Sequence, residues 1–301
     1  DSDWRDIRTV PATIEQAFPS NLYGGRLTID LDAIVSNWSL LKGKVSDSTD
    51  CAAVLKADAY GTGQDKTAAA LYQAGCRTFF VAVPTEALTL RASLPDAVIY
   101  VLDGLFPGTA DHFLTHDIRP VLGSLEELLE WAEVCKASGK NNAAAVHVDT
   151  GIHRLGLSPA ELTRALGDNT VLGPFQPSLV MSHLACGSTP DHDMNRRQLK
   201  LFTETTAPFP HIPRSLANSA GVLLGPDYHF DLVRPGIALY GGLAIETEPN
   251  PMKPVAKVEA RIMIVREPSQ DGTNSHSPGG QPTGTARSIK KPGCPRPHPI
   301  K

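Results

Sequence analysis

The chain has 301 residues, of which 41 % are apolar and 20 % charged, and its formal net charge is −4. This length fits one large α/β barrel or two ordinary domains, and this charge gives no electrostatic reason to expect a nucleic acid or membrane surface as partner. No apolar run reaches the roughly 20 residues that cross a bilayer, and five scattered cysteines without CxxC spacing predict reduced thiols in a cytoplasmic protein.

The chain then alternates between two kinds of pattern. Residues 1–25 form a polar leader for which we expect irregular structure. Residues 26–31 alternate in polarity as a strand does, and residues 31–45 carry apolar side chains at helical spacing. From Cys51 onward short apolar runs recur, and a helical pattern follows most of them. Eight runs can be counted, at 52–57, 78–83, 97–102, 118–123, 143–151, 178–185, 214–221 and 231–242.

Two of the helical patterns carry clear signals for their ends. In 124–140, Ser124 is the expected N-cap, Glu127 stands three residues on, and Gly139 lies near the end. In 158–168, Pro159 takes the first helical position. The helical pattern is weakest at 222–230. Eight strands alternating with helices predict an α/β fold, a (β/α)₈ barrel over 26–250, more than an open doubly wound sheet.

The character of the chain changes after the last of these runs. Residues 254–267 alternate like a strand, and we interpret 251–267 as the remnant of a C-terminal β-domain with which the strand at 26–31 could pair. Residues 268–301 hold seven prolines, five glycines and no aromatic residue. Such a segment buries too little apolar surface to offset its chain entropy, so we predict a disordered tail.

Polar side chains lie near the carboxyl ends of several predicted strands. In a (β/α)₈ barrel these ends meet on one face, where the chemistry gathers. This coincidence is the strongest local indication of a functional site. The residues concerned are Lys56, Tyr60, Arg154, His183, Asn218, Ser219 and Arg234.

Lys56 in "CAAVLKADAYGTG" has two interpretations. A lysine at a strand end can extend to water along its aliphatic stem. Alternatively, a desolvated amine loses its proton readily and becomes a nucleophile toward a carbonyl, forming a Schiff base. Tyr60 and Gly61 favour the second interpretation, because a phenol and a flexible backbone suit the capture of a phosphate.

The other candidates are also ambiguous when each is taken alone. Arg234 could form a surface ion pair, but an arginine in an apolar run needs a buried acceptor, and Gly236 permits close approach of a ligand. Asn218 and Ser219 could cap a helix, and a helix N-terminus also binds anions. His183 could be an ordinary core histidine.

Two further classes of site are disfavoured. The "DTG" at 149–151 resembles an aspartic-protease motif, but no second such motif follows it in the sequence. The histidines at 147, 153, 192 and 211 do not have the spacing of metal ligands, so no metal site is predicted.

Taken together, five motifs resemble those of alanine racemase, a barrel enzyme that depends on pyridoxal phosphate. The resemblance covers about Arg26 to Arg266, and its motifs occur in the family's order. They are "VLKADAYGTG", "VDTGIHRLGL", "MSHLA", "ANSAG" and "VRPGIALYG". The resemblance implies interconversion of L- and D-alanine through an aldimine and a carbanion, a supply of D-alanine for peptidoglycan, and a homodimer.

The resemblance also assigns roles to matching positions. It implies that Lys56 holds the cofactor as an aldimine and is the base on the D-side of the substrate. Arg154 would lie near the phenolic oxygen and the substrate, and Arg234 would face the pyridine nitrogen with His183 in support. An arginine essentially never gives up its proton, so that nitrogen would stay unprotonated. The cofactor-binding set is completed by Tyr60, Asn218, Ser219, Gly236 and Ile237, four of which would bind or approach the phosphate.

The sequence departs from the family pattern at two places. His147 stands where many relatives have a lysine, often carbamylated, that orients the arginine. The family's second base is a tyrosine in a "GYG"-like segment of the C-terminal domain, expected near residue 280, where this chain reads "SPGGQPTG". No tyrosine follows Tyr240. We therefore expect a truncated or aberrant C-terminal domain, impaired racemisation and a weakened or lost dimer.

Two alternative functions remain. One is a non-catalytic barrel that binds pyridoxal phosphate as a carrier, which the missing base favours. The other is a Schiff-base aldolase without a cofactor, which would leave Arg234 and the phosphate-suited segments without a role.

Overall fold

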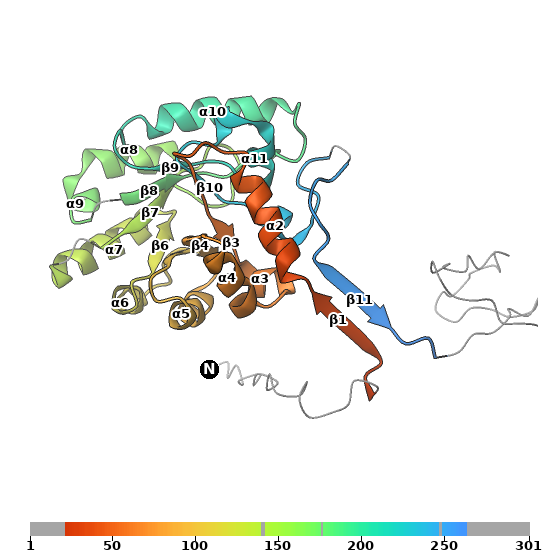
Figure 1. Ribbon diagram of the computed structural model, residues 1–301. Helices are drawn as coiled ribbons and strands as arrows, with labels where there is room; N and C mark the ends of the chain where they lie inside the picture. The colour runs from red at the N-terminus through yellow and green to blue at the C-terminus, as the bar shows by residue number, and fades with distance from the viewer. Residues whose placement is uncertain (1–21, 140–141, 176, 247–248, 264–301) are drawn as a thin grey trace, which may run out of the picture. The chain divides into compact units, whose positions relative to one another are not determined.

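The computed structural model describes residues 22–139, 142–175, 177–246 and 249–263, and its core is a barrel of parallel strands surrounded by helices (Figure 1). The first barrel strand is β2 (Asp50–Cys51), which continues after Ala52 as β3 (Ala53–Val54). The other strands are β4 (Thr78–Val81), β5 (Val98–Val101), β6 (Arg119–Leu122), β7 (Ala144–His147), β8 (Pro177–Met181), β9 (Arg214–Ser215) and β10 (Leu232–Val233).

The strand pairing closes the barrel. Strands β3 to β9 form one parallel sheet in chain order. On the other side of the first strand, β10 pairs with β2 in parallel, with Leu232 opposite Asp50. Beyond β9 and β10, Asn218 and Arg234 form a parallel bridge, and the Arg234 N–H donates to the Ala217 carbonyl at 2.9 Å. The predicted (β/α)₈ barrel is confirmed.

Helices follow the strands as the patterns indicate. They are α2 (Leu31–Lys42), α4 (Gln64–Gln73), α5 (Pro84–Ser93), α6 (Ala110–Thr115), α7 (Leu125–Ser138), α8 (Pro159–Gly167), α9 (Asn169–Leu172), α10 (Asp193–Thr206) and α11 (Ser219–Leu224). The predicted ends of α7 are confirmed, with Ser124 as N-cap in a capping box with Glu127 and Gly139 in the left-handed conformation. Where the pattern was weakest, α11 is short and the 3₁₀ turn η2 (Pro226–Tyr228) follows it.

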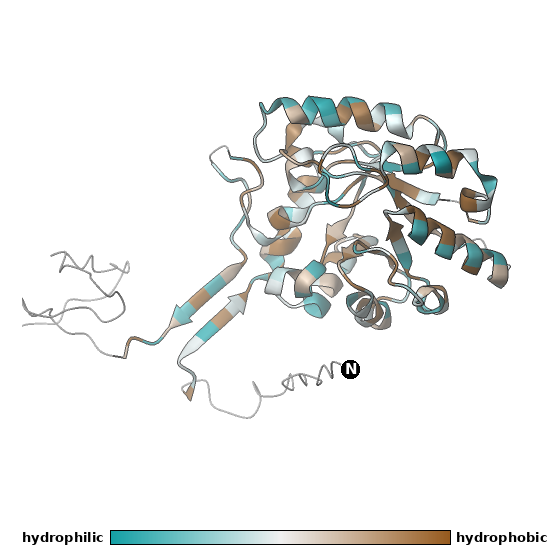
Figure 2. Ribbon diagram, turned by 180° about the vertical axis from the view of Figure 1, so that it is seen from behind, coloured by the Kyte–Doolittle hydropathy of each residue, from teal (hydrophilic) through white to brown (hydrophobic). Residues whose placement is uncertain are grey.

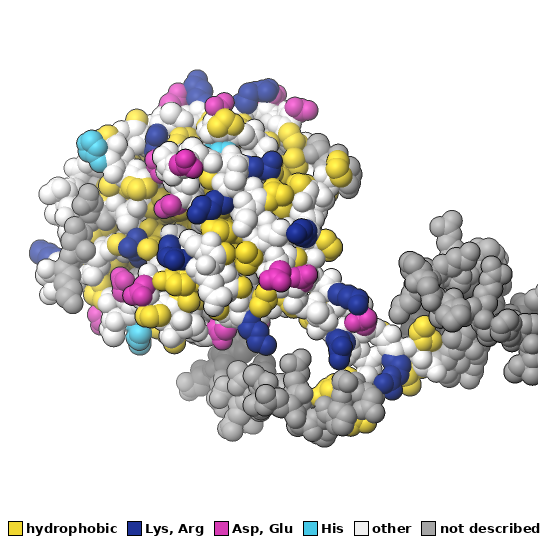
Figure 3. Space-filling model, in the orientation of Figure 1, with side chains coloured by type: hydrophobic (Ala, Val, Ile, Leu, Met, Phe, Trp, Pro, Cys, Tyr) yellow, Lys and Arg dark blue, Asp and Glu magenta, His cyan; other side chains and the backbone are white. Residues whose placement is uncertain are grey.

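Apolar side chains form one cluster inside the barrel and another between the barrel and its helices. On β4, Phe80 belongs to the inner cluster, whereas Phe79 and Val81 belong to the outer one, as the two-residue period of a strand requires. The strands are largely brown in Figure 2, and the helices show polar residues along their outer faces. Lys and Arg side chains are interspersed with Asp and Glu on the face drawn in Figure 3. Within the described residues, no helix is both long and apolar enough to cross a membrane.

A two-stranded sheet shares no strand with the barrel. It pairs β1 (Gly25–Ile29) with β11 (Ala256–Ala260), and the two arrows run in opposite directions in Figure 1. Where β1 ends, the Asp30 N–H donates to the Val255 carbonyl at 2.8 Å. Most of the predicted leader, part of the predicted remnant strand and the whole predicted tail at 268–301 lie outside the described residues.

Candidate active site

A left-handed helical turn follows the first barrel strand. Four consecutive residues, Ala57 to Tyr60, have φ between 53° and 56°, although none of them is glycine. Each such residue costs about 1–2 kcal/mol, because its Cβ approaches the backbone too closely. The sequence predicted a strand as far as residue 57. Instead, Lys56 opens this turn and Tyr60 ends it, with the Lys56 Nζ 5.9 Å from the centre of the Tyr60 ring.

Tyr60 is held between an aromatic ring and a glycine. Its ring stacks on Tyr240, with the centroids 4.6 Å apart, and the Tyr240 hydroxyl donates to the Val54 carbonyl at 2.9 Å. A Cβ at Gly236 would overlap the Tyr60 hydroxyl, so this glycine is required for the close approach. Burial raises the pKa of both phenols, which therefore stay neutral near pH 7. Sequence analysis gave Tyr240 no role, because nothing in the sequence indicates a stacking partner 180 residues away.

Arg234 is a buried cation at the end of β10. Its side chain is 3 % exposed, and burial lowers its pKa to about 9. Its guanidinium donates to the Ser215 carbonyl at 2.9 Å, to the Ser215 hydroxyl, and to the Ser182 carbonyl at 2.6 Å. Among the described residues, no carboxylate forms an ion pair with it. The ion pair weighed as the ordinary interpretation of this arginine is therefore wrong for the described chain.

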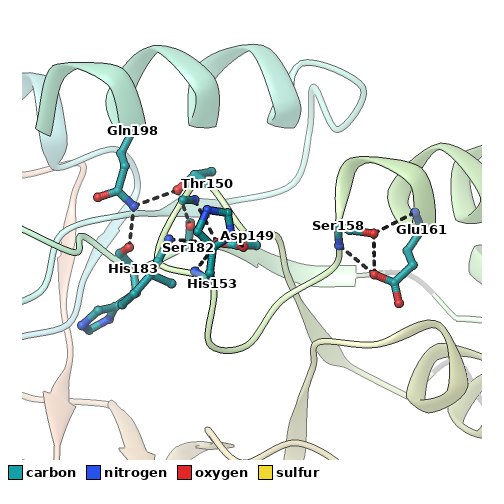
Figure 4. A network of polar contacts seen from close by, with 10 residues as sticks. Asp149, Thr150, His153, Ser158, Glu161, Ser182, His183 and Gln198 are labelled. Atoms are coloured by element: carbon teal, nitrogen blue, oxygen red, sulfur yellow. Dashed lines mark hydrogen bonds and ion pairs between the residues drawn. The ribbon is translucent and has the colours of Figure 1, made fainter. Parts of the chain in front are cut away.

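His183 follows β8 and is held neutral by its surroundings. Burial, followed by the charges of Arg234 and Arg154, lowers its pKa to about 3. Its Nε2 lies 3.3 Å from the Asn218 side-chain nitrogen, which fits an N–H donated by Asn218. The backbone of this segment is held by Gln198 of α10, whose side chain donates to the His183 carbonyl at 2.9 Å and to the Thr150 hydroxyl at 3.2 Å (Figure 4).

Asn218 and Ser219 lie where β9 passes into α11. Asn218 is the N-cap of the helix, accepting from the Gly221 N–H at 3.0 Å. The Ser219 hydroxyl accepts from the Gly236 N–H at 2.8 Å and so joins this corner to the segment after β10. Ile237 opens the 3₁₀ turn η3 (Ile237–Tyr240). Backbone N–H groups in such first turns have no acceptor within their own helix.

Arg154 lies in a loop built around Asp149. The Asp149 carboxylate accepts from the N–H groups of residues 151, 152 and 153 at 2.9–3.2 Å, and it pairs with His153 at 3.0 Å. Burial alone would raise the pKa of Asp149, but these bonds lower it overall. In the "DTG" motif, Asp149 thus shapes the loop that carries Arg154, and Arg154 itself is exposed.

His147 lies just before that loop and differs from what the family pattern requires. Burial, together with the charge of Arg234, lowers its pKa to about 4, so it is neutral near pH 7. Its Nε2 is buried without a hydrogen-bond partner among the described residues. It lines a separate cavity of about 250 Å³ with Leu102 and Glu127. A neutral ring in this place cannot supply the negative charge of a carbamylated lysine.

All nine predicted site residues line one cavity of about 410 Å³ at the carboxyl ends of the strands. They come from the segments after β3, β7, β8, β9 and β10, and Leu102 adds a contribution from β5. Lys56 is exposed, so the burial that sequence reasoning assumed for its amine is not provided by the described residues. Sequence analysis missed the apolar part of the lining, which includes Leu102, Ile152, Leu184, Leu243 and Ala244.

Fold and cavity define a (β/α)₈-barrel protein with a lysine and a buried arginine in one cavity at the carboxyl ends of its strands. Residues 29–244 match the family model described as alanine racemase, N-terminal domain. The chain is 50 % identical over 245 residues to the alanine racemase of Methylobacterium nodulans, a match that covers 81 % of this chain and 66 % of that protein. The chain belongs to the alanine racemase family.

Other relatives extend this result. Agrobacterium fabrum has a biosynthetic alanine racemase that is 47 % identical over 268 residues, covering 87 % of this chain and 68 % of that protein. The crystal structure of alanine racemase from Bartonella henselae, with covalently bound pyridoxal phosphate, is 43 % identical with a TM-score of 0.77. That match covers 81 % of this chain and 70 % of the other. The chain spans about two thirds of the length of the curated relatives it matches.

Proposed function

We propose that this chain binds pyridoxal phosphate in the 410 Å³ cavity and uses Lys56 to move the α-proton of alanine. The observation that carries the proposal is the convergence of Lys56 and Tyr60, which follow β3, with Arg234, which follows β10, on one cavity. The cavity lining offers groups that suit the pyridine nitrogen and the phosphate of this cofactor. When bound, the cofactor supplies an electron sink for the negative charge that develops at the substrate α-carbon.

The buried guanidinium of Arg234 suits the pyridine nitrogen. Its bonds to Ser182 and Ser215 leave part of its five-donor capacity unused, and its side chain lines the cavity. An acceptor without a formal negative charge fits there, because the surrounding carbonyl oxygens already offset the cation. With its pKa at about 9, Arg234 remains a donor near pH 7 and would therefore hold the ring nitrogen as an acceptor.

The corner of the cavity formed by Ser219, Gly236 and Ile237 suits a phosphate. Ser219, Ala220 and Ile237 line the cavity at the first turns of α11 and η3, where backbone N–H groups need outside acceptors. Tyr60, neutral near pH 7, adds a hydroxyl donor to the same corner. Gly236 leaves the space between this phenol and the backbone open.

Lys56 lines the same cavity and is the base that we propose for the D-side. Among the described residues, no second base stands opposite it, since His183 has a pKa of about 3 and Arg154 and Arg234 are cations. The sequence also contains no tyrosine after Tyr240. We therefore propose that the 301-residue chain exchanges the α-proton of D-alanine faster than it converts D- to L-alanine. A homodimer, predicted from the family resemblance, remains a proposal.

The test is proton exchange in D₂O with the protein loaded with pyridoxal phosphate. We expect D-alanine to lose its α-proton signal in the NMR spectrum, while L-alanine forms about 10²–10⁴-fold more slowly, the usual effect of one missing general base. Chiral chromatography measures the second rate. Equal rates of exchange and racemisation would contradict the one-sided mechanism, and free pyridoxal phosphate at the same concentration is the blank.

A second candidate function is a carrier of pyridoxal phosphate without catalysis. The absence of an opposed base among the described cavity residues favours it. The carrier predicts a yellow protein that loses its colour in Lys56→Ala but exchanges no α-proton above the blank. The same experiment therefore separates the two functions.

Replacement of Gly236 by alanine tests the phosphate corner. The new methyl group would overlap the Tyr60 hydroxyl and come 3.4 Å from the Val54 Cβ, so the Tyr60 ring has to move. Overpacking of this kind costs about 1–3 kcal/mol, which corresponds to a rise of about 5- to 150-fold in the dissociation constant for pyridoxal phosphate. Fluorescence titration measures the constant, and an unchanged value in a folded variant would argue against a phosphate beside Tyr60.

A further inference from the structure

The left-handed turn that carries Lys56 and Tyr60 requires a restraint. Four non-glycine residues in this conformation cost about 1–2 kcal/mol each, so the turn has no intrinsic stability. Strained backbone of this kind persists only where the surrounding structure imposes it. The contacts of the residues at the centre of the turn identify what imposes it.

Glu86 makes a hydrogen bond that reaches the centre of the turn from another loop. It is the third residue of α5, and its Oε2 accepts from the Ala82 N–H at 2.8 Å, at the start of that helix. Its Oε1 accepts from the Asp58 N–H at 3.2 Å, in the middle of the left-handed turn. One carboxylate thus joins the loop after β4 to the turn after β3.

Gln64 closes this contact into a ring. The Asp58 carboxylate accepts from the Gln64 N–H at 2.7 Å, and the Gln64 side chain donates to the Glu86 carbonyl at 3.0 Å. The Gly63 N–H also donates to the Asp58 carbonyl at 3.1 Å. The backbone of Asp58 is therefore held from both sides, and Glu86 is the member of the ring whose carboxylate bridges two loops.

We propose that Glu86 is the positioning residue of the site: its carboxylate holds the Asp58 N–H and thereby keeps Lys56 and Tyr60 in the arrangement that receives pyridoxal phosphate. The statement that this arrangement receives pyridoxal phosphate rests on the proposed function. Glu86 itself does not line the 410 Å³ cavity and so acts only through the turn.

The chain provides a matched control in Glu127. Glu127 is the third residue of α7, its Oε2 accepts from the Gly123 and Ser124 N–H groups at 2.7 and 3.0 Å, and its Oε1 accepts from the Leu105 N–H at 2.8 Å. Both carboxylates thus cap their own helix and join it to an earlier loop. Only Glu86 reaches the lysine turn, so a comparison of the two isolates that contact.

The experiment compares Glu86→Gln with Glu127→Gln. Glutamine keeps one oxygen for the N-cap but turns an amide donor toward the other N–H, which breaks that contact. We expect similar falls in the thermal midpoint for the two variants. Only Glu86→Gln should speed amide hydrogen exchange at 57–60 in the apoprotein and raise the dissociation constant for pyridoxal phosphate. Both changes should be about tenfold, the factor for one hydrogen bond to a charged group.

A rescue experiment excludes a purely structural role. Glycine adopts the left-handed conformation without steric cost, and Ala57 is exposed with φ of 53°. Ala57→Gly in the Glu86→Gln background should recover part of the binding, although it repairs nothing at the start of α5. Equal shifts in both glutamine variants, no rescue, or faster exchange at 57–60 with unchanged binding would each overturn the proposal. A wild-type protein that binds no pyridoxal phosphate would refute the proposed function, while amide exchange would still show whether Glu86 restrains the turn.

Discussion

Lys56→Ala is expected to abolish the covalent attachment of pyridoxal phosphate and to lower α-proton exchange on D-alanine by at least about 10²–10⁴-fold. The amine is both the proposed attachment point and the proposed base, so the methyl group that replaces it can do neither. The protein should lose its visible yellow absorbance. After reduction of the wild-type protein with borohydride, peptide mapping should find the label on the peptide that contains Lys56.

The matched control for this prediction is Lys66→Ala. Lys66 is an exposed lysine on α4, ten residues further along the chain, and it does not line the 410 Å³ cavity. This variant should keep the colour, the label and the exchange rate. A label on any other lysine of the wild-type protein, or a yellow Lys56→Ala protein, would show that the cofactor is attached elsewhere.

Acid is expected to destabilise the fold through two histidines before the carboxylates titrate. The pKa is about 4 for His147 and about 3 for His183, against 6.5 when unfolded, because burial and nearby arginines disfavour their charged forms. Below pH 6.5 the unfolded chain therefore binds protons that the folded chain does not, and stability falls as pH falls. Between pH 7 and 5 the loss should approach about 2 kcal/mol per histidine.

Urea unfolding at a series of pH values measures this slope. His147→Leu removes one of the two groups. It breaks no hydrogen bond of the ring Nε2, because this atom has no partner among the described residues. The variant should therefore show about half of the wild-type slope over this range, because one of two comparable linkages is gone. A free energy of unfolding that stays constant from pH 7 to 5 would show that the buried rings accept protons in the folded state.

Most of the barrel could be predicted from the sequence, and the reason is physical. Eight short apolar runs that alternate with amphipathic helical stretches favour one fold, the (β/α)₈ barrel. Capping residues such as Ser124 and Glu127 act over one helical turn, so their effect can be recognised locally. Seven of the nine candidate site residues could be chosen because each lies near the end of a predicted strand. The choice of Ile237 and the phosphate role of Gly236 came from the family resemblance, and the structure brings all nine to one cavity.

The local conformation around Lys56 could not be predicted. Of Ala57, Asp58, Ala59 and Tyr60, only Asp58 is of a residue type that is enriched in left-handed backbone, and one such residue does not mark a run of four. The contact from Glu86 lies 28 residues away and has no signature in the sequence. The same holds for His147, whose neutral state depends on the burial and the arginines around it. Long-range contacts, rather than local propensity, decide these details.

Closure of the barrel has a consequence for the order of assembly. The last strand, β10, pairs with the first, with Leu232 opposite Asp50. Pairings between residues so distant in sequence pay a large loop-closure entropy and form slowly. The bridge between Asn218 and Arg234 lies on the other side of β10, toward β9, and both residues belong to the cavity. The cavity is therefore completed only when the ring is complete, and a ligand held by Arg234 selects against chains in which the pairing of β10 with β2 is open.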